Sequence, residues 1–546
     1  MSHSTFAAHY QPKKQPVGPW LGQSQPSAPA SALLHPNLPD AERRRYLAMI
    51  AQGLTKTSRT TRRPQRVIVI GAGMAGLSAA YELLRAGHDP VILEAAQRVG
   101  GRCYTLRQPF RHGLYAEAGA MRFPATHELV FAYINQFQLP VRKFTGANPN
   151  GLFFLQGHTT RMGDVLSDPT TPQSQMVKRW EATIAPLLTY YFSEQAKGNN
   201  VWPEIVKRYH ALSLHDFLRL QGWNQEEIEL LGAIGVGRGG LRSVLPVAFL
   251  ELFYLSVTGS DKGEYQIIGG TDQLPNALLT QTPAGLAAGP GATLQERIHY
   301  GAKVTAITQT GSRIRVHYQG TAGAAVMEGD YAITTIPFPR FRQVSVTPRL
   351  SPRKAAAIRE LNYVAASKIF LQCKSRFWEK AAAQPAVKGM IASDLPVRIS
   401  YFPDPTPGQE RAVILASYTW GEEAATWSAL SPTERIERAV ACLAQIYPDI
   451  VNEVEVGASC VWDDSQPFAG NAFCLAAPGQ QVRFADAIRQ PEGRLHFAGE
   501  HTAYAHGWVE GAIESGLRCA LAIHESSQQV RQHQPVMPRQ QFPIAA

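Results

Sequence analysis

The chain has 546 residues, of which 45% are hydrophobic, and a formal net charge of +10. This length allows about two or three domains with large cores, and the composition excludes a chain that is disordered throughout. No apolar run approaches the roughly 18 to 20 residues that span a bilayer, and the N-terminus lacks the apolar core of a signal peptide, so a soluble cytoplasmic protein with no membrane partner is expected.

The surplus of positive charge gathers in two short stretches, 42–45 and 56–66, that flank the first predicted strand. A solvated linker explains these stretches better than a nucleic-acid site, and a tail that attracts anions is the alternative. The six cysteines are scattered without any CxxC spacing, which indicates reduced thiols and neither a disulfide framework nor a zinc site. We therefore expect no nucleic acid and no metal ion as partners.

The first predicted elements are an extended arm, a short helix and a buried strand. Residues 1–39 are rich in Pro, Ser and Gln, and a helix over 40–52 follows, ended by Gly53. The apolar run RVIVI (66–70) stops abruptly at glycine, which is typical of a buried parallel strand. A helix and the strand VILEA (91–95) come next, at the spacing of a βαβ unit.

The centre of the chain is predicted to be helical. Apolar residues recur at three-to-four spacing between about 171 and 259, and Asn224 with Glu227 has the pattern of a capping box. This indicates a helical insertion, after which strands return. The predicted strands of the second half are 303–308, 313–318, 331–337, 368–373 and 412–418, and HFAGE (496–500) leads into a final helix that ends near His524.

The hexapeptide GAGMAG (71–76) fits the GxGxxG pattern of a dinucleotide-binding turn. A predicted strand precedes it, a helix follows, and Glu94 ends the next strand. Gly71 suits the tight turn, and Gly73 allows a pyrophosphate to approach the helix N-terminus. Gly76 allows the helix to pack closely on the strand. The acidic Glu94 suits free ribose hydroxyls, so a Rossmann-type α/β fold is expected, with a purely structural glycine turn as the alternative.

Five motifs together resemble the flavin amine-oxidase superfamily over residues 65–525. They are GAGMAG, EAAQRVGGR, KVTAI, FAGEHT and HGWVEGAIESG. The resemblance implies FAD in a glutathione-reductase-like domain, with Arg102 on the cofactor, the Val304 backbone at the adenine and Glu500 near the ribitol. It also implies that the helix after Gly507 directs its N-terminal dipole at the flavin carbonyl.

In some members of this superfamily the flavin is attached to a cysteine. Here PFAGNAF (467–473) has Ala472 in the place of that cysteine, and Cys474 lies two positions too late. The resemblance therefore implies FAD that is bound without a covalent bond.

The stretch AEAGAMRFP (116–124) resembles the loop of L-amino acid oxidases and L-amino acid 2-monooxygenases. Gly119 and Ala120 are expected to let the backbone pass the flavin edge, and Arg122 to hold a substrate carboxylate with its planar fork. A structural salt bridge is the alternative for Arg122. Lys368, in SKIFLQC, resembles the lysine that is bound through water to flavin N5, with an exposed position on an edge strand as the alternative.

Aromatic residues complete the expected site. Phe473 and Trp508 occupy the places of the family's aromatic cage, and Tyr418 and Trp420 are expected in the substrate cavity, with core packing as the alternative. Of His496, His501 and His506, whose spacing suits no metal motif, His506 is expected nearest the chemistry. The expected substrate pocket comprises Tyr418, Trp420, His506, Gly507 and Val244. The expected cofactor-binding residues are Gly71, Gly73, Ala75, Gly76, Glu94, Ala95, Gly101, Arg102, Gly119, Ala120, Met121, Arg122, Val304, Gly499, Glu500, Gly507, Trp508, Val509 and Ala512.

The resemblance and the pattern of elements divide the chain into three folded parts with extended ends. These are an N-terminal arm and short helix (1–64), an FAD-binding domain (65–115, 260–340 and 455–525), a mixed-sheet substrate-binding domain (116–170 and 341–454), a helical domain (171–259) and a disordered tail (526–546).

The resemblance implies oxidative deamination of L-amino acids by FAD and O₂, giving 2-oxo acid, ammonia and hydrogen peroxide. A 2-monooxygenase, which forms the amide, is the first alternative, and an amine oxidase or a non-catalytic binding protein is less favoured. The segment 235–249, which resembles the part of the helical domain that reaches the side-chain pocket, has no acid before Glu251. Neutral or aromatic substrates are therefore expected, unless an acid such as Asp394 enters the pocket, and a homo-oligomer is expected.

Overall fold

The computed structural model describes residues 39–54, 63–234, 245–257, 263–379, 386–404, 408–463, 465 and 467–529. The predicted arm, apart from its last residue, and the expected pocket residue Val244 lie outside these ranges, as does the tail from 530 onward. The short helix is confirmed as α2 (Asp40–Gln52), and it ends at Gly53, whose φ of 83° suits glycine.

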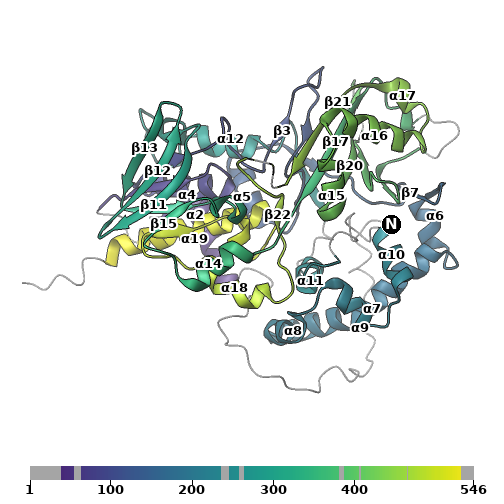
Figure 1. The fold of residues 1–546 in the computed structure, drawn as a ribbon, viewed down its shortest axis with the longest axis horizontal. Helices are drawn as coiled ribbons and strands as arrows, with labels where there is room; N and C mark the ends of the chain where they lie inside the picture. The colour runs from purple at the N-terminus through teal and green to yellow at the C-terminus, as the bar shows by residue number, and fades with distance from the viewer. Residues whose placement is uncertain are drawn as a thin grey trace, which may run out of the picture.

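A parallel five-stranded sheet with the order β10-β2-β1-β14-β23 forms the centre of one half of the molecule. Its strands are β1 (Arg66–Ile70), β2 (Asp89–Leu93), β10 (Ile298–His299), β14 (Tyr331–Thr334) and β23 (Leu495–Phe497). The helices α4 (Met74–Arg85) and α19 (Val509–Gln529) pack against each other on this half (Figure 1). The predicted strands at 66–70, 91–95 and 331–337 are confirmed as strands of this sheet, with small shifts of their ends.

The two faces of β1 are covered by different layers. Val67 and Val69 pack in the cluster of α4 and α19, whereas Ile68 and Ile70 pack in the cluster of a second, four-stranded sheet. This second sheet has the order β13-β12-β11-β15. Its strands are β11 (Lys303–Thr310), β12 (Arg313–Gly320), β13 (Gly323–Gly329) and β15 (Ser345–Thr347). Because both faces are buried, the continuous apolar run of β1 is explained.

The other half contains a mixed seven-stranded sheet with the order β21-β17-β20-β19-β18-β7-β8. Its strands are β7 (Leu152–Leu155), β8 (His158–Arg161), β17 (Ala366–Cys373), β18 (Gly389–Ser393), β19 (Ile399–Phe402), β20 (Ala412–Trp420) and β21 (Val454–Trp462). The helices α15 (Gly421–Ser428), α16 (Pro432–Ala444) and α17 (Ile450–Glu453) lie beside it (Figure 1).

A group of helices occupies the region below the seven-stranded sheet in Figure 1. These are α6 (Met162–Ser167), α7 (Pro172–Ala196), α8 (Trp202–Tyr209), α9 (Leu214–Leu220), α10 (Gln225–Ile234) and α11 (Phe249–Val257). The helical insertion is thus confirmed, and so is the capping box, because Asn224 and Glu227 exchange hydrogen bonds of 2.8 and 3.0 Å.

Several elements differ from the expected boundaries. β21 pairs with β17 in the seven-stranded sheet, although 455–525 was assigned to the FAD-binding part. β5 (Phe123–Pro124) and β6 (Val141–Lys143) pair with β9 (Glu264–Ile267), and α19 continues to Gln529, beyond the predicted end near His524. The remaining elements are β3 (Thr105–Leu106), β4 (Ala116–Glu117), α5 (Glu128–Gln136), α12 (Gln273–Thr280), α13 (Phe338–Phe341), α14 (Pro352–Glu360), β16 (Tyr363–Val364), β22 (Phe473–Cys474) and α18 (Gln480–Arg489).

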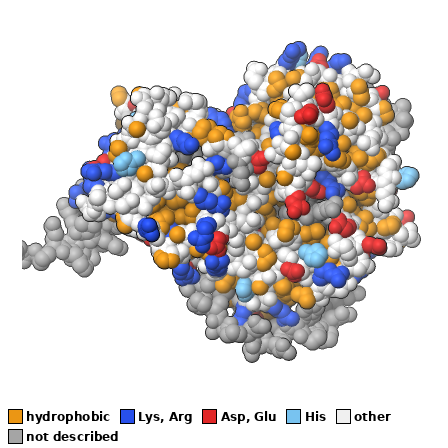
Figure 2. All heavy atoms as spheres, viewed as in Figure 1, with side chains coloured by type: hydrophobic (Ala, Val, Ile, Leu, Met, Phe, Trp, Pro, Cys, Tyr) orange, Lys and Arg blue, Asp and Glu red, His pale blue; other side chains and the backbone are white. Residues whose placement is uncertain are grey.

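Basic side chains are spread over the face shown in Figure 2, and acidic side chains are interspersed among them. Among the described residues, no helix is both long and apolar enough to cross a membrane.

Candidate active site

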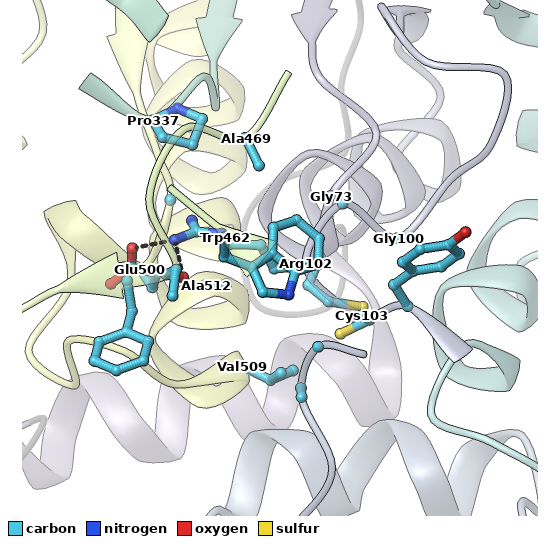
Figure 3. A pocket seen from close by; sticks show the side chains of 18 of the residues that line it. Gly73, Gly100, Arg102, Cys103, Pro337, Trp462, Ala469, Glu500, Val509 and Ala512 are labelled. Atoms are coloured by element: carbon cyan, nitrogen blue, oxygen red, sulfur yellow. Dashed lines mark hydrogen bonds and ion pairs between the residues drawn. The ribbon is translucent and has the colours of Figure 1, made fainter. Parts of the chain in front are cut away.

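A cavity of about 650 Å³ lies where the parallel sheet, the seven-stranded sheet and α11 meet (Figure 3). It is bounded by the turn after β1, the loop after β2, the stretch 118–122, strands β17 and β20, and the N-terminal end of α19. Every expected site residue within the described ranges lines this cavity, with the exception of Gly76. The structure thus brings together residues that are more than four hundred positions apart in the sequence, such as Gly71 and Ala512.

The turn between β1 and α4 needs glycine at two positions for different reasons. Gly71 has a φ of 104°, and a Cβ there would lie 2.5 Å from the Thr335 hydroxyl. A Cβ on Gly76 would lie 2.0 Å from the backbone oxygen of Gly71, which explains why Gly76 packs behind the cavity. A Cβ on Gly73, in contrast, would have no atom within 4 Å, so the side of Gly73 on which a Cβ would lie faces open space at the N-terminus of α4.

Glu94 directly follows β2 and lines the cavity. Its two carboxylate oxygens accept hydrogen bonds from the backbone N–H groups of Ala72, at 2.6 Å, and Ala96, at 2.8 Å. Burial raises the pKa of Glu94, and these two hydrogen bonds oppose that rise. The carboxylate is therefore fixed at the end of β2, next to the glycine turn.

Arg102 joins the loop after β2 to the segment before α19. Its Nη1 donates 2.8 Å hydrogen bonds to Glu500 Oε1 and to the backbone oxygen of Ala472, and Figure 3 shows both interactions. The second oxygen of Glu500 accepts from the backbone N–H of Gly507 at 2.7 Å. Glu500 is thereby neutralised and held between two walls of the cavity.

The beginning of α19 also forms part of the cavity wall. Gly507 has a φ of 75°, and Val509 and Ala512 line the cavity near it. Trp508 packs against the ring of His127, with ring centroids 4.9 Å apart. A helix of this length with its N-terminus at a cavity provides a favourable place for negative charge.

The reason for glycine at position 119 differs from the expected one. A Cβ on Gly119 would lie 1.7 Å from the backbone oxygen of Arg102, because the two loops cross in close contact. The backbone N–H of Ala120 donates to the same oxygen at 2.9 Å. Both residues line the cavity, and backbone crowding by itself is sufficient to require glycine at 119.

Arg122 lies in the cavity wall and is only 9% exposed. Its Nε donates to Glu264 Oε1 at 3.0 Å, and its Nη1 donates to the Tyr401 hydroxyl at 3.2 Å. Burial, the largest single effect, lowers the pKa of Arg122, but Glu264 together with Tyr401 and Tyr418 raises it, and the net pKa is above its ordinary value. The structural salt bridge, which was the alternative for Arg122, is therefore present. However, Nη2 donates no hydrogen bond to any described residue.

Lys368 is buried in β17, between β21 and β20, so the alternative of an exposed edge position is wrong. Its Nζ donates to the backbone oxygens of Gly119, at 2.7 Å, and Glu117, at 3.0 Å. The ammonium also lies 4.9 Å from the centroid of the Tyr418 ring. Burial lowers the pKa of Lys368 to about 7, and the Glu117 carboxylate opposes this effect.

Three of the aromatic residues predicted for the site, Tyr418, Trp420 and Phe473, form a row along the cavity. The ring centroids of Tyr418 and Trp420 are 5.6 Å apart, and those of Trp420 and Phe473 are 5.0 Å apart. Trp420 and Phe473 also pack against the helical cluster that includes Leu475. Cavity lining and core packing, which the sequence left as alternatives for Tyr418 and Trp420, are therefore both present in Trp420. They are also both present in Tyr418, which packs against the cluster of Phe370 and Leu415.

His506 lines the cavity, whereas His496 and His501 do not belong to its lining. Its Nδ1 lies 2.9 Å from Glu251 Oε1, and the same oxygen accepts from the backbone N–H of Ala476 at 3.0 Å. Burial lowers the pKa of His506, but Glu251 raises it above its ordinary value. Among the described residues, no group of His, Cys, Asp and Glu side chains could hold a metal ion.

The sequence did not identify the roles of Glu251, Glu264 and Tyr401. Glu251 marked the end of an acid-free segment, and nothing in the sequence indicated that it faces His506. The alternative acid Asp394 does not line the cavity, because it accepts from the backbone N–H of Gln156 at 2.7 Å elsewhere in the seven-stranded half. Glu264 contacts Arg122 across 142 positions, and no local pattern reveals such a contact.

Residues 74–524 match the family described as flavin containing amine oxidoreductase. The chain is 37% identical over 477 residues to a Bacillus subtilis (strain 168) protein named "Putative L-amino-acid oxidase YobN", covering 84% of this chain and 95% of that one. It is 31% identical over 503 residues to an L-amino-acid oxidase of Daboia russelii, covering 88% and 93% of the two chains.

Solved structures show the same fold at lower identity. Cyclohexylamine oxidase from Brevibacterium oxydans IH-35A matches with a TM-score of 0.67 and 20% identity, over 86% of this chain and all of the other. Putrescine oxidase bound to putrescine matches with a TM-score of 0.67 and 20% identity, over 84% and 99% of the two chains. With a family match that spans most of its length and relatives above 30% identity, the chain belongs to the flavin containing amine oxidoreductase family.

Proposed function

We propose that this protein is an FAD-dependent L-amino acid oxidase. The reaction consumes an L-amino acid, O₂ and water, and it yields a 2-oxo acid, ammonia and hydrogen peroxide. The observation that carries the proposal is Arg122, a buried guanidinium in the cavity wall whose Nη2 has no partner among the described residues. A carboxylate matches this fork, and a simple amine offers it nothing to bind.

The cavity suits FAD in its donor and acceptor chemistry. The open side of Gly73 at the N-terminus of α4 suits a phosphate, and the fixed carboxylate of Glu94 suits ribose hydroxyls. Val304 and Arg102 would hold the adenine and flavin ends, and the N-terminus of α19 would face the flavin ring. FAD supplies the redox capacity of the enzyme, taking up two electrons from the substrate and passing them to O₂.

We propose that FAD is bound without a covalent bond. Ala472, which lines the cavity, cannot form a thioether. Cys474 is fully buried and is not among the residues that line the cavity. Cys103 does line it, but burial raises the pKa of this thiol to about 12, so the reactive thiolate is disfavoured.

The side chains around the substrate would orient it for oxidation at Cα. Arg122 would hold the carboxylate, and Phe473 and Trp508 would flank the amine. The amine must lose its proton before oxidation, since a positive charge on nitrogen opposes loss of electrons from Cα. Lys368, fixed by the oxygens of Gly119 and Glu117, would provide a cation near the place where O₂ is reduced.

The lining supports neutral or aromatic amino acids as substrates. Each acid in the lining already accepts at least two hydrogen bonds: Glu94 from Ala72 and Ala96, Glu251 from His506 and Ala476, and Glu500 from Arg102 and Gly507. A cationic substrate side chain would therefore compete with protein donors for these carboxylates, although Glu251 accepts both of its hydrogen bonds at Oε1 and not at Oε2. Leu252, Tyr254 and Leu475 add apolar surface beside Trp420.

We also propose a division of the chain into parts, an oligomeric state and a cellular location. The parallel and four-stranded sheets would form the FAD-binding part, with β21 moved to the substrate-binding part because it pairs with β17. The protein would form a homo-oligomer and would be located in the cytoplasm.

The relatives named L-amino-acid oxidase favour an oxidase over a monooxygenase. The distinction is tested by incubating the enzyme aerobically with each of the twenty L-amino acids while peroxide, 2-oxo acid and amide are measured. We expect peroxide and 2-oxo acid in near-equal amounts, with neutral and aromatic substrates fastest. Amide as the main product would contradict the oxidase assignment.

A further inference from the structure

Two side chains that are not part of the cavity lining accept hydrogen bonds from Arg122. Glu264, at the start of β9, receives a hydrogen bond from Nε at 3.0 Å, and the Tyr401 hydroxyl receives one from Nη1 at 3.2 Å. Arg122 belongs to the lining, and neither Glu264 nor Tyr401 is among the described residues that do. Neither partner therefore touches a ligand in the cavity, and each can influence one only by holding Arg122 or, for Glu264, through its charge.

These hydrogen bonds leave the Nη1 and Nη2 end of the Arg122 guanidinium available for a ligand. A guanidinium has five N–H donors, and the Nε donor and one Nη1 donor are already used. The end formed by Nη1 and Nη2 keeps one hydrogen on Nη1 and two on Nη2. One hydrogen from each of these nitrogens can therefore bind a carboxylate with two parallel hydrogen bonds. A ligand carboxylate would then lie on the side of the guanidinium away from Glu264.

The charges in this arrangement oppose tight binding. The side chains of Arg122 and Glu264 are 9% and 20% exposed, so solvent screens their interaction only in part. Without a ligand, Glu264 neutralises Arg122. When a carboxylate binds, two anions must share one guanidinium, because Lys368, the next cation, already donates to two backbone oxygens and titrates near neutrality.

We propose that Glu264 is a positioning residue that directs the Nη end of Arg122 into the cavity and, through its negative charge, weakens the binding of carboxylates there. The inference rests on the proposed role of Arg122 in binding the substrate carboxylate. Its consequence concerns the product as well as the substrate, since a 2-oxo acid carries the same carboxylate as the amino acid. Glu264 thus limits the time that product and other monocarboxylates occupy the site.

The test is a titration of the purified holoenzyme with benzoate, a monocarboxylate that cannot be oxidised. Dissociation constants are measured by isothermal titration calorimetry and by the change in flavin absorbance, for the wild type and for Glu264→Gln. Glutamine keeps an oxygen acceptor for Nε but removes the charge, so we expect benzoate to bind roughly tenfold more tightly. The KM for L-phenylalanine should fall by a similar factor, while kcat does not rise in proportion.

A matched control separates charge from position. Tyr401→Phe removes the other hydrogen bond to Arg122 without changing any charge, and it should leave benzoate binding unchanged or weaker. Arg122→Met should abolish benzoate binding at this site. If Glu264→Gln binds benzoate no more tightly than the wild type, or if neither protein binds it, the inference is overturned.

The stability of the variant gives a second measurement. Glu264→Gln leaves a buried guanidinium without a counterion, so its Tm should be lower than that of the wild type and should rise more on addition of benzoate. If the variant cannot be purified, refolding in the presence of benzoate should rescue it, and failure of this rescue would also count against the inference. Absence of amino-acid oxidation by the wild type would contradict the proposed function alone, because the benzoate comparison does not depend on turnover.

Discussion

At the scale of single residues, two buried cations border the same cavity but differ in how their charge is maintained. Arg122 has Glu264 as a direct counterion, and its pKa is raised above an already high value, so it stays charged near neutral pH. Lys368 has only backbone oxygens as direct partners, and burial lowers its pKa to about 7. One cation is thus permanent and suited to binding, and the other titrates near neutrality.

Replacing Lys368 by Met should slow reoxidation of the flavin by O₂ more than its reduction by substrate, as measured by stopped-flow absorbance. In the wild type, the ammonium form favours the negative charge that develops on O₂. The reoxidation rate should therefore fall as the pH rises through about 7, the pKa of Lys368, and this dependence should disappear in Lys368→Met.

Lys354→Met provides the control for that experiment. Lys354 is also buried with its pKa lowered to about 7, but it donates to the backbone oxygen of Gln490 and is not part of the cavity lining. Its replacement should leave the pH dependence of reoxidation unchanged. A slower reduction step alone in Lys368→Met would show that Lys368 has a different role.

At the scale of elements, two glycines in the turn between β1 and α4 have different roles. Gly76 is required for the packing of the fold, and Gly73 is expected to be required for binding FAD. Gly76→Ala would place a Cβ 2.0 Å from the backbone oxygen of Gly71, so thermal unfolding should show a protein destabilised by about 1 to 3 kcal/mol or more. Gly73→Ala meets nothing within 4 Å and needs no unusual φ, so the apoprotein should unfold at the wild-type temperature. FAD binding by Gly73→Ala, followed by fluorescence, should nevertheless be weaker. Equal stability of the two variants would contradict this division.

Local patterns predicted these elements well because their causes are local. The packing of Gly76 on Gly71, the helix ending at Gly53 and the capping box at Asn224 each depend on residues within a few positions of one another. The contacts that define the site are of another kind. The Nζ of Lys368 is held by backbone oxygens about 250 positions away, and Glu264 meets Arg122 through the pairing of β5 with β9, so neither contact leaves a pattern in the sequence.

At the scale of the whole molecule, the cavity is closed by two sheets from different halves. The stretch 118–122 crosses between them, where the Trp462 side chain of β21 donates to the backbone oxygen of Ala118 at 2.7 Å and Lys368 of β17 donates to that of Gly119. The parallel-sheet half contributes the glycine turn, Glu94 and the start of α19. A bound cofactor would therefore contact both halves and stabilise their association.

Acid denaturation should release FAD into solution, with no flavin absorbance left on the precipitated polypeptide, because Ala472 offers no attachment point. The apoprotein should also have a lower Tm than the holoprotein, since a ligand that binds only the folded state adds its binding free energy to stability. Flavin that remains with the denatured chain on a gel would contradict non-covalent binding.

The central claim is that Arg122 selects amino acids by their carboxylate, and the most direct measurement compares kcat/KM for L-phenylalanine and phenethylamine in the wild type and in Arg122→Met. These substrates differ only in the carboxylate. Loss of a desolvated ion pair costs about 2 to 5 kcal/mol, so the wild type should prefer L-phenylalanine by a factor of roughly 30 to 5,000. In Arg122→Met this preference should fall to near unity. Rapid oxidation of phenethylamine by the wild type, or an unchanged preference in the variant, would contradict the account.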